Sequence, residues 1–343
     1  MEYAGRYRIF DAGGIQTYPV RERTNKVTLR DILYPDQIDP ERIDLPEETR
    51  ERVHGVADHI LAARRAGHPV ICFTGGHLIK NGLGKLLADL VERDVVTLVG
   101  GQAATSIHDF ELALIGETSE YVPQALEKGQ FGMAYEFSYM NTALKVGDQY
   151  RLGYGESLGR MMCDDSFRKE VLDLVGREGA PTEFQHPDIS VIAACYRHGT
   201  PLAIHVGIGT DVLDQHPSFD GRAKGGCSGR DFLMYTNEVA KLTDGGVVLN
   251  IGSAVTGPEV LLKAVSMVSN TGKVPRGIIT ADFDLRDFIP DKMTDEASKY
   301  YYFRDQKSIV TRIPQAFQGK GYYVQGNQIR TFPLLYQRII DQL

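Results

Sequence analysis

The sequence feature that most constrains the fold is an alternation of short apolar runs with amphipathic segments. The apolar runs HPVICFTG, VVTLVGG and TPLAIHVGIG are separated by stretches with apolar residues at helical spacing. Parallel strands need a crossover connection, which is usually a helix, so this alternation is typical of βαβ units. The sequence therefore predicts the α/β class, with a parallel sheet.

The same pattern gives the domain organisation. Residues 1–44 have many charges, scattered prolines and no clear period, and we expect an irregular arm that packs on a partner subunit. Residues 46–66 begin with a proline and acidic residues and have helical spacing, which predicts a helix. No stretch resembles a flexible linker and no repeat is evident. We therefore predict a single α/β domain over 45–343, with a helical insertion at about 118–200 and a less periodic tail from 299.

Composition and charge exclude several classes of protein. The chain has 343 residues, and 38 Lys and Arg against 45 Asp and Glu give a net charge of −7. No basic block is present to neutralise phosphates, so we expect no nucleic-acid partner. The N-terminus lacks a signal-peptide layout and no apolar run approaches a membrane span, so we expect no membrane partner. The four cysteines are far apart with no CxxC pair, which favours free thiols and a cytoplasmic protein.

Polar or glycine-rich stretches directly follow the expected strands. These stretches are 74–77, 100–102, 205–211, 252–253 and 280–284. In a doubly wound sheet the loops at the carboxyl ends of the strands converge on one crevice, where ligands bind. The helix N-termini that follow such loops present free N–H groups to anions. We therefore expect one shared site, although βα turns also need glycine for conformational reasons alone.

No standard nucleotide fingerprint is present. GYGESLG at 153–159 has the wrong glycine spacing and follows QYRL rather than an apolar strand. GLGKLL lacks the upstream glycine and the Ser or Thr of a P-loop. The chain is therefore not expected to be an NTPase.

Three histidines and an aspartate are candidates for chemistry. His77 follows a glycine pair at an expected helix start, while His205, Asp211 and His216 fall within twelve residues. Imidazole and carboxylate groups can bind a divalent metal or act as general bases near neutral pH. Their spacing matches no compact metal motif, so we predict no metal site.

Two lysines are candidates for binding or catalysis because of their neighbours in the sequence. Lys307 follows the aromatic run YYYF and precedes an apolar run, and a lysine that is neutralised in an apolar pocket can form an imine. Lys80 would point from the first helical turn after the TGGH loop, a position that suits an anion.

Several of these stretches together resemble a known family. GGHLIKNGLGKLLADLVERDVV, followed by a glycine-bearing loop and HDFELAL, resembles the NAD-binding region of deoxyhypusine synthase. PLAIHVGIGTDVL, GGVVLNIGSAV and IITADFD are similar, in order and spacing, to later segments of that family. The resemblance runs from about residue 65 to 285. It implies a Rossmann-like parallel sheet flanked by helices, NAD as cofactor, and a homotetramer with sites at subunit interfaces.

The resemblance also implies an activity and a set of site residues. The family is a polyamine-dependent transferase: it oxidises spermidine by hydride transfer and moves an aminobutyl group through a lysine imine. In the activity that the resemblance implies, Asp211 or Glu259 binds substrate, His205 or His77 handles protons, and Lys307 is the candidate nucleophile. The residues expected to bind the cofactor are Gly75, Gly76, His77, Leu78, Gly101, Asp109, Gly252 and Thr280.

The chain departs from the family at several positions, most clearly at its lysine motif. It contains no tryptophan, so the family's Trp-Gly-Lys motif is absent. The sequence predicts an NAD-dependent enzyme that acts on an amine or a related small substrate by hydride transfer, with group transfer through a lysine imine. Two alternatives stay open: a metal-dependent hydrolase or lyase that uses His205, Asp211 and His216, and a non-catalytic NAD-binding module.

Overall fold

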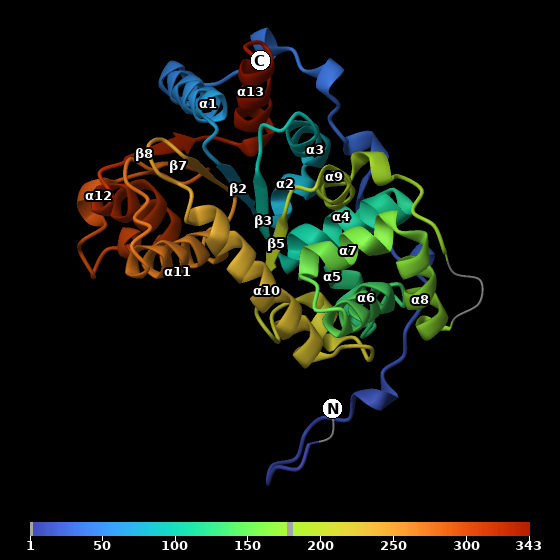
Figure 1. Ribbon diagram of the computed structural model, residues 1–343. Helices are drawn as coiled ribbons and strands as arrows, with labels where there is room; N and C mark the ends of the chain where they lie inside the picture. The colour runs from blue at the N-terminus through green and yellow to red at the C-terminus, as the bar shows by residue number, and fades with distance from the viewer. Residues whose placement is uncertain (1–2, 177–180) are drawn as a thin grey trace.

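The centre of the molecule is a six-stranded parallel sheet (Figure 1). A computed structural model describes residues 3–176 and 181–343. The sheet has the order β5-β3-β2-β6-β7-β8, and every neighbouring pair is parallel. Its strands are β2 (Val70–Thr74), β3 (Leu98–Gln102), β5 (Leu202–His205), β6 (Val247–Ile251), β7 (Ile279–Asp284) and β8 (Lys320–Gln325). The predicted α/β class with a parallel sheet is confirmed.

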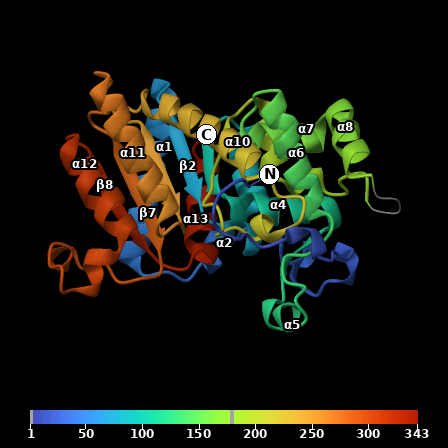
Figure 2. The same cartoon turned by 90° about the horizontal axis from the view of Figure 1, so that it is seen from below.

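Helices cover both faces of this sheet. They are α1 (Glu47–Ala66), α2 (Gly76–Lys80), α3 (Gly84–Glu92), α4 (Ala103–Ile115), α5 (Val122–Glu127), α6 (Phe137–Gln149), α7 (Tyr154–Cys163), α8 (Asp165–Val175), α9 (Val191–His198), α10 (Gly221–Val239), α11 (Thr256–Asn270), α12 (Ile313–Ala316) and α13 (Gln328–Ile340). Figure 1 shows α1 beside α13, and the two helices are in extensive contact. Figure 2 shows α6, α7 and α8 grouped at one end of the molecule, with α11 and α12 at the other.

The burial pattern of β2 explains why the sheet has two covered faces. Val70 and Cys72 belong to one apolar cluster, and Ile71 and Phe73 belong to a second. Successive side chains of a strand point to opposite faces, so a continuous apolar run needs helices on both sides. The apolar run that predicted this strand therefore also fixed its central place in the sheet.

The segment 78–94 has apolar residues at helical spacing, but the structure divides it between α2 and α3. Gly82 has φ +75°, a left-handed conformation that interrupts the helix. A Cβ atom at this position would lie 1.8 Å from the carbonyl oxygen of Asp31. The break therefore lets the N-terminal arm approach the backbone closely at this position.

The N-terminal arm contains a strand that fixes it to the insertion. β1 (Asn25–Thr28) pairs antiparallel with β4 (Glu117–Glu120), and Tyr18 forms a bridge with Ala134. The segment predicted as a helical insertion, apart from residues 177–180, which lie outside the described part, contains β4 and the helices α5 to α9. The arm and the insertion together build one wall of the site described below.

The C-terminal tail contributes more than its weak periodicity predicted. It supplies the edge strand β8, a π-helix (Gln306–Arg312) and α13. The burial of β8 is mixed, which is usual for an edge strand and blurs its sequence signal.

Two further features concern the chain as a whole. The four cysteines are free thiols. Within 3–176 and 181–343, no helix combines the length and apolar character that a membrane span requires.

Candidate functional site

The strand order reverses between β2 and β6. From β2 the chain builds outward through β3 to β5, and then returns to build β6, β7 and β8 on the other side. The loops after β2 and β6 are in contact, because the Gly75 N–H donates to the Ile251 carbonyl at 3.0 Å. A Cβ atom on Gly75 would lie 2.2 Å from the Gly252 carbonyl oxygen. Ligands of open α/β sheets bind at this kind of reversal, at the carboxyl ends of the strands.

The loop after β2 places the predicted cofactor residues in different environments. Gly76 lies against α4, where an added Cβ would be 3.0 Å from the Ala104 Cβ. His77 is exposed, whereas the Leu78 side chain is fully buried in the core. Partial burial and the nearby charges of Lys80, His108 and Lys26 lower the pKa of His77. Only its backbone could bring Leu78 to a ligand, while His77 presents a side chain.

The Asp109 side chain stabilises the fold through hydrogen bonds to the start of α9. Its carboxylate accepts hydrogen bonds from the Ser190 hydroxyl at 2.5 Å and from the N–H groups of Val191 and Ile192 at 2.9 and 3.0 Å. These donors lie at the start of α9, so Asp109 caps that helix. Burial raises the pKa of Asp109 to about 6 even though these donors act to lower it.

A cavity of about 250 Å³ opens beside the loop after β2, and we call it the edge cavity. Its walls come from the N-terminal arm, the end of α2, α4, the first part of the insertion and the loop after β5. The charged side chains that line it are Arg23, Lys26, Lys80, Glu111, Glu120 and Asp211. The volume is near the lower end for small-molecule sites.

His205 lies among aromatic rings at the end of β5. Its ring stacks on Phe73 at 5.7 Å between centroids and makes edge contacts with Tyr235 and Phe232. It is 7% exposed, and its Nε2 has no partner among the described residues. Burial lowers the pKa of His205 from 6.5 to about 4, so the imidazole is neutral at physiological pH.

The burial of His205 predicts that the stability of the folded chain depends on pH. The unfolded chain binds a proton at residue 205 more tightly than the folded chain, so stability is lost as pH falls from 6.5 towards 4. At about pH 5 the loss from this one group is about 2 kcal/mol. We expect His205→Phe to remove that part of the loss, and urea unfolding at a series of pH values measures it. The exposed His198, changed to Phe, should leave the profile unchanged, and equal profiles for the two variants would contradict the prediction.

Asp211 and His216 do not join His205 in a metal site. The Asp211 carboxylate pairs with Lys224 Nζ at 2.7 Å, and Asp214 pairs with the same ammonium. The His216 Nδ1 lies 2.6 Å from the Ser218 hydroxyl. In the part of the chain that the structure describes, no three His, Cys, Asp or Glu residues are placed to hold a metal ion. The hydrolase or lyase alternative therefore loses the metal cluster on which it was based.

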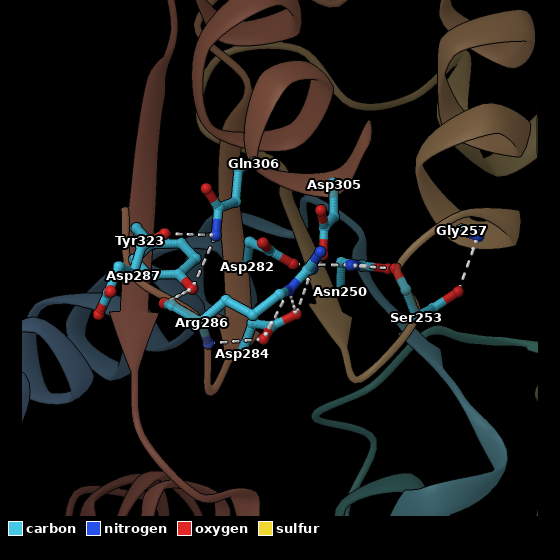
Figure 3. Close-up of polar contacts among 10 residues, drawn as sticks. All are labelled: Asn250, Ser253, Gly257, Asp282, Asp284, Arg286, Asp287, Asp305, Gln306 and Tyr323. Carbon is cyan, nitrogen blue, oxygen red and sulfur yellow. Dashed lines mark hydrogen bonds and ion pairs between the residues drawn. The ribbon is translucent and has the colours of Figure 1, made fainter. Parts of the chain in front are cut away.

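A second polar network occupies the carboxyl ends of β6 and β7 (Figure 3). The Asn250 amide donates to Asp282 Oδ1 at 2.7 Å and to the Ser253 carbonyl at 2.9 Å. Asp282 has no exposed surface, and burial together with the charge of Asp305 raises its pKa well above the usual range. The Ser253 hydroxyl accepts from the Gly257 N–H at 2.9 Å, which ties the network to the start of α11.

Arg286 links two more carboxylates of this network. It forms ion pairs with Asp284 at 2.5 Å and with Asp305. Burial raises the pKa of Asp305 to about 6 although Arg286 acts to lower it. For Asp284 burial acts upward, but the hydrogen bonds and charge of Arg286 bring its pKa below the usual value. Figure 3 shows the three aspartates around this one guanidinium, and we call these residues with Asn250 the acidic network.

The acidic network has unused acceptors. The buried oxygens Asn250 Oδ1, Asp282 Oδ2 and Asp305 Oδ1 have no hydrogen-bond partner among the described residues. Buried polar atoms normally find partners, so a group of unused acceptors indicates a place for a donor-rich ligand or for water. An ammonium group carries three donors and no acceptor, which suits these oxygens.

Three predicted site residues lie apart from the acidic network. Lys307 Nζ donates to the Tyr301 carbonyl at 3.0 Å and lies over the Tyr301 ring, beside a different cavity. Glu259 pairs with Lys263 one turn along α11 in a partly exposed ion pair. Thr280 is the second residue of β7, is fully buried and donates to the Ile309 carbonyl. Their predicted roles have no direct support from these positions and stay predictions.

Sequence reasoning missed most of the acidic network. One signal was present in IITADFD, where two acids stand two residues apart on a buried strand. Carboxylates are almost never fully buried unless they are paired, so an acid inside an apolar run marks a site. Asn250 in VVLNIGS carries the same signal. Asp305 and Arg286 could not be added because only the fold brings them to the ends of these strands.

Several solved structures are similar to this chain at low sequence identity. No family model matches it, and no curated protein matches it. Among solved structures it is similar to AgrE in a ternary complex with ornithine and NAD+, with 15% identity, a TM-score of 0.47, and coverage of 88% of this chain and 34% of AgrE. A candidate LOR/SDH protein from Methanococcus maripaludis S2 has 14% identity and a TM-score of 0.44, with coverage of 87% and 71%.

A candidate deoxyhypusine synthase from Entamoeba histolytica is also similar. It has 10% identity and a TM-score of 0.38, and the match covers 96% of this chain and 97% of that one. The chain spans about a third of the length of AgrE. The structure therefore defines an α/β protein with a Rossmann-like parallel sheet whose strand order reverses between β2 and β6.

Proposed function

We propose that this chain is an enzyme that binds NAD across the carboxyl edge of its sheet and oxidises an amine. The observation that carries the proposal is the strand order. Numbered along the chain within the sheet, the strands stand in the order third, second, first, fourth, fifth, sixth. This is the order of the two joined mononucleotide-binding halves that bind dinucleotides at the reversal of the sheet.

The residues at the reversal suit a dinucleotide. Gly75 and Gly76 have no Cβ, so the loop after β2 packs directly against Gly252 and against the first turn of α4, which brings the three segments together at the edge where dinucleotides bind. The residue before α4, Gln102, does not cap that helix with its side chain. The first N–H groups of α4 are then available to an anion.

The acidic network lies on the half of the sheet away from β3 and β5, where the nicotinamide half of the cofactor would extend. Bound NAD supplies a hydride acceptor. The unused oxygens of Asp282 and Asp305 would hold the substrate ammonium. Oxidation of a C–H next to nitrogen removes a hydride from carbon and a proton from nitrogen. A carboxylate with a pKa of about 6, such as that of Asp305, suits a base for this proton near neutral pH.

The proposed reaction has a second step, in which a group from the oxidised amine is transferred through an imine at Lys307. Burial, with the charges of Arg312 and Arg304, lowers the pKa of Lys307, which favours the neutral amine that attacks a carbonyl or imine. Gln306, the preceding residue, donates from its amide to the Tyr323 hydroxyl at 3.0 Å within the region of the acidic network. The lysine therefore adjoins the network in sequence, while its ammonium points to a separate cavity.

The proposal predicts reduction of NAD by an amine. The full chain would be incubated with NAD and with spermidine, diamines or basic amino acids, and the absorbance of reduced nicotinamide followed. We expect Asp282→Asn to lower the rate by about a hundredfold or more, because the substrate ammonium loses one of the two carboxyl groups that would hold it beside the base. The exposed Asp173, changed to Asn, is the matched control.

The outcomes of this assay separate the alternatives. Binding of NAD without reduction by any amine would leave a non-catalytic NAD-binding module. Full activity in Asp282→Asn would remove the acidic network from the mechanism. If Lys307→Ala still reduced NAD but no longer transferred a group from the amine, that lysine would be assigned to the imine step.

A further inference from the structure

We propose that the edge cavity is a subsite for a phosphate monoester, held by Lys26, Lys80 and Arg23. This goes beyond the proposed function, since a free phosphorylated metabolite would occupy the cavity without any dinucleotide. The 2′-phosphate of NADP has the same chemistry, and the experiment below distinguishes these two sources.

The cavity is a built feature of the fold. Arg23 and Lys26 come from the N-terminal arm, which the pairing of β1 with β4 holds in place. Lys80 comes from the end of α2, and Thr210 comes from the loop after β5. Segments far apart in the sequence therefore surround one space at the carboxyl edge.

The acidic side chains of the cavity already have partners. Glu111 Oε1 lies 2.6 Å from Arg23 Nη1. Glu120 accepts from the Tyr18 hydroxyl at 2.8 Å and from the Gly132 N–H at 3.0 Å. Asp211 pairs with Lys224. These contacts hold the carboxylates in the walls, and the negative charges of Glu111 and Glu120 act mainly on Arg23.

The lysines, in contrast, are unpaired. Neither Lys26 nor Lys80 has a carboxylate within ion-pair distance in the described residues. Burial, and then the charge of Lys26, lowers the pKa of Lys80. Nearby His77 also has its pKa lowered, by partial burial and by Lys80, His108 and Lys26. This end of the cavity is therefore locally positive and attracts an anion.

Arg23 provides a second, independent indication. It is 8% exposed, and its Nη1 and Nε are occupied by Glu111 and Asn25. Its Nη2 is buried and has no partner among the described residues. Arg23 lines the cavity, so an anion bound at its guanidinium would supply the acceptor that this nitrogen lacks.

The chemistry favours a phosphate monoester. Such a group carries a charge of about −1.5 to −2 and three acceptor oxygens near neutral pH, which suits two unpaired ammonium groups and one guanidinium donor. The apolar wall of Ile107, Val122, Phe131 and Phe137 would contact the organic part of the ligand. β3 also ends in Gln102, where NAD-specific folds place an acid for the adenosine ribose and NADP-binding folds accommodate a 2′-phosphate.

The test is a calorimetric titration of the full chain with ribose 5-phosphate and with ribose. We expect ribose 5-phosphate to bind at least about tenfold more tightly than ribose. Lys26→Met and Lys80→Met keep the aliphatic stem and should each weaken its binding about tenfold. Lys169→Met, on an exposed ion pair of α8, should have no effect. Equal affinities for the sugar and its phosphate, or unchanged binding in both lysine variants, would overturn the proposal.

Two further titrations identify the source of the phosphate. A preference for NADP over NAD that is lost in Lys80→Met would assign the phosphate to the cofactor. Simultaneous binding of NAD and ribose 5-phosphate would assign it to a separate metabolite. If ribose 5-phosphate binds and neither dinucleotide does, the subsite stands and the proposed function falls. If NAD binds and no phosphate monoester does, the reverse holds.

Discussion

Replacing Lys224 with methionine should lower the free energy of unfolding by about 3–5 kcal/mol. The Lys224 side chain is 1% exposed, and its ammonium is the partner of two carboxylates, Asp211 and Asp214. Without it, two acids remain close together at sites that are 14% and 6% exposed, with no cation between them. Urea unfolding of the variant and the parent chain at neutral pH measures the change.

Two controls separate this effect from a general loss of charge. Lys169→Met breaks an exposed pair with Asp173 and should change stability by less than about 1 kcal/mol. Neutralising both acids as well, in a variant with Lys224→Met, Asp211→Asn and Asp214→Asn, should restore part of the lost stability. If Lys224→Met were no worse than Lys169→Met, the buried ion triplet would not stabilise the loop after β5.

Replacing Gly75 with valine should destabilise the fold by about 3 kcal/mol and separate the loops at the reversal of the sheet. The backbone of Gly75 has an ordinary conformation, so the effect comes from space and not from backbone strain. The first carbon of the new side chain would lie 2.2 Å from the Gly252 carbonyl oxygen, a backbone atom that cannot move aside as a flexible side chain can. Thermal and urea unfolding measure the loss.

The matched control is a glycine in open space. Gly225 lies in α10, and an added Cβ would meet no atom within 4 Å. Gly225→Ala should therefore stabilise the protein by about 0.5–1 kcal/mol, since alanine favours a helix. A Gly75→Val variant as stable as the parent would show that the two loops are not held together as described.

The fold was largely predictable because its signals are local. Apolar runs such as VICFT carry their own strand signal, and the helix predicted over 46–66 is found at Glu47–Ala66. The rule that loops at the carboxyl ends of parallel strands meet then correctly brought the loops of Gly75 and Gly252 together. β8 was missed because an edge strand of mixed burial has no clear period.

The roles of single polar residues were less predictable, since they depend on partners distant in sequence. Asp109 was expected at the cofactor, but its carboxylate caps a helix that starts 82 residues later. Asp211 was expected to bind substrate, and its partner Lys224 comes from α10. His205 and Asp211 lie close in sequence, yet one is enclosed by aromatic rings and the other lines the edge cavity. Asp211 lies in the loop after β5, where the strand alternation that places His205 no longer applies.

The central claim is that a dinucleotide binds at the reversal between β2 and β6. The most direct test is calorimetric titration of the full chain with NAD, with Gly75→Val studied below its unfolding temperature. The account predicts saturable binding by the parent chain and a loss of at least about tenfold in affinity in the variant, because the new side chain pushes apart the two loops that form the site. Absence of binding at millimolar NAD, or equal affinity in the two proteins, would contradict it.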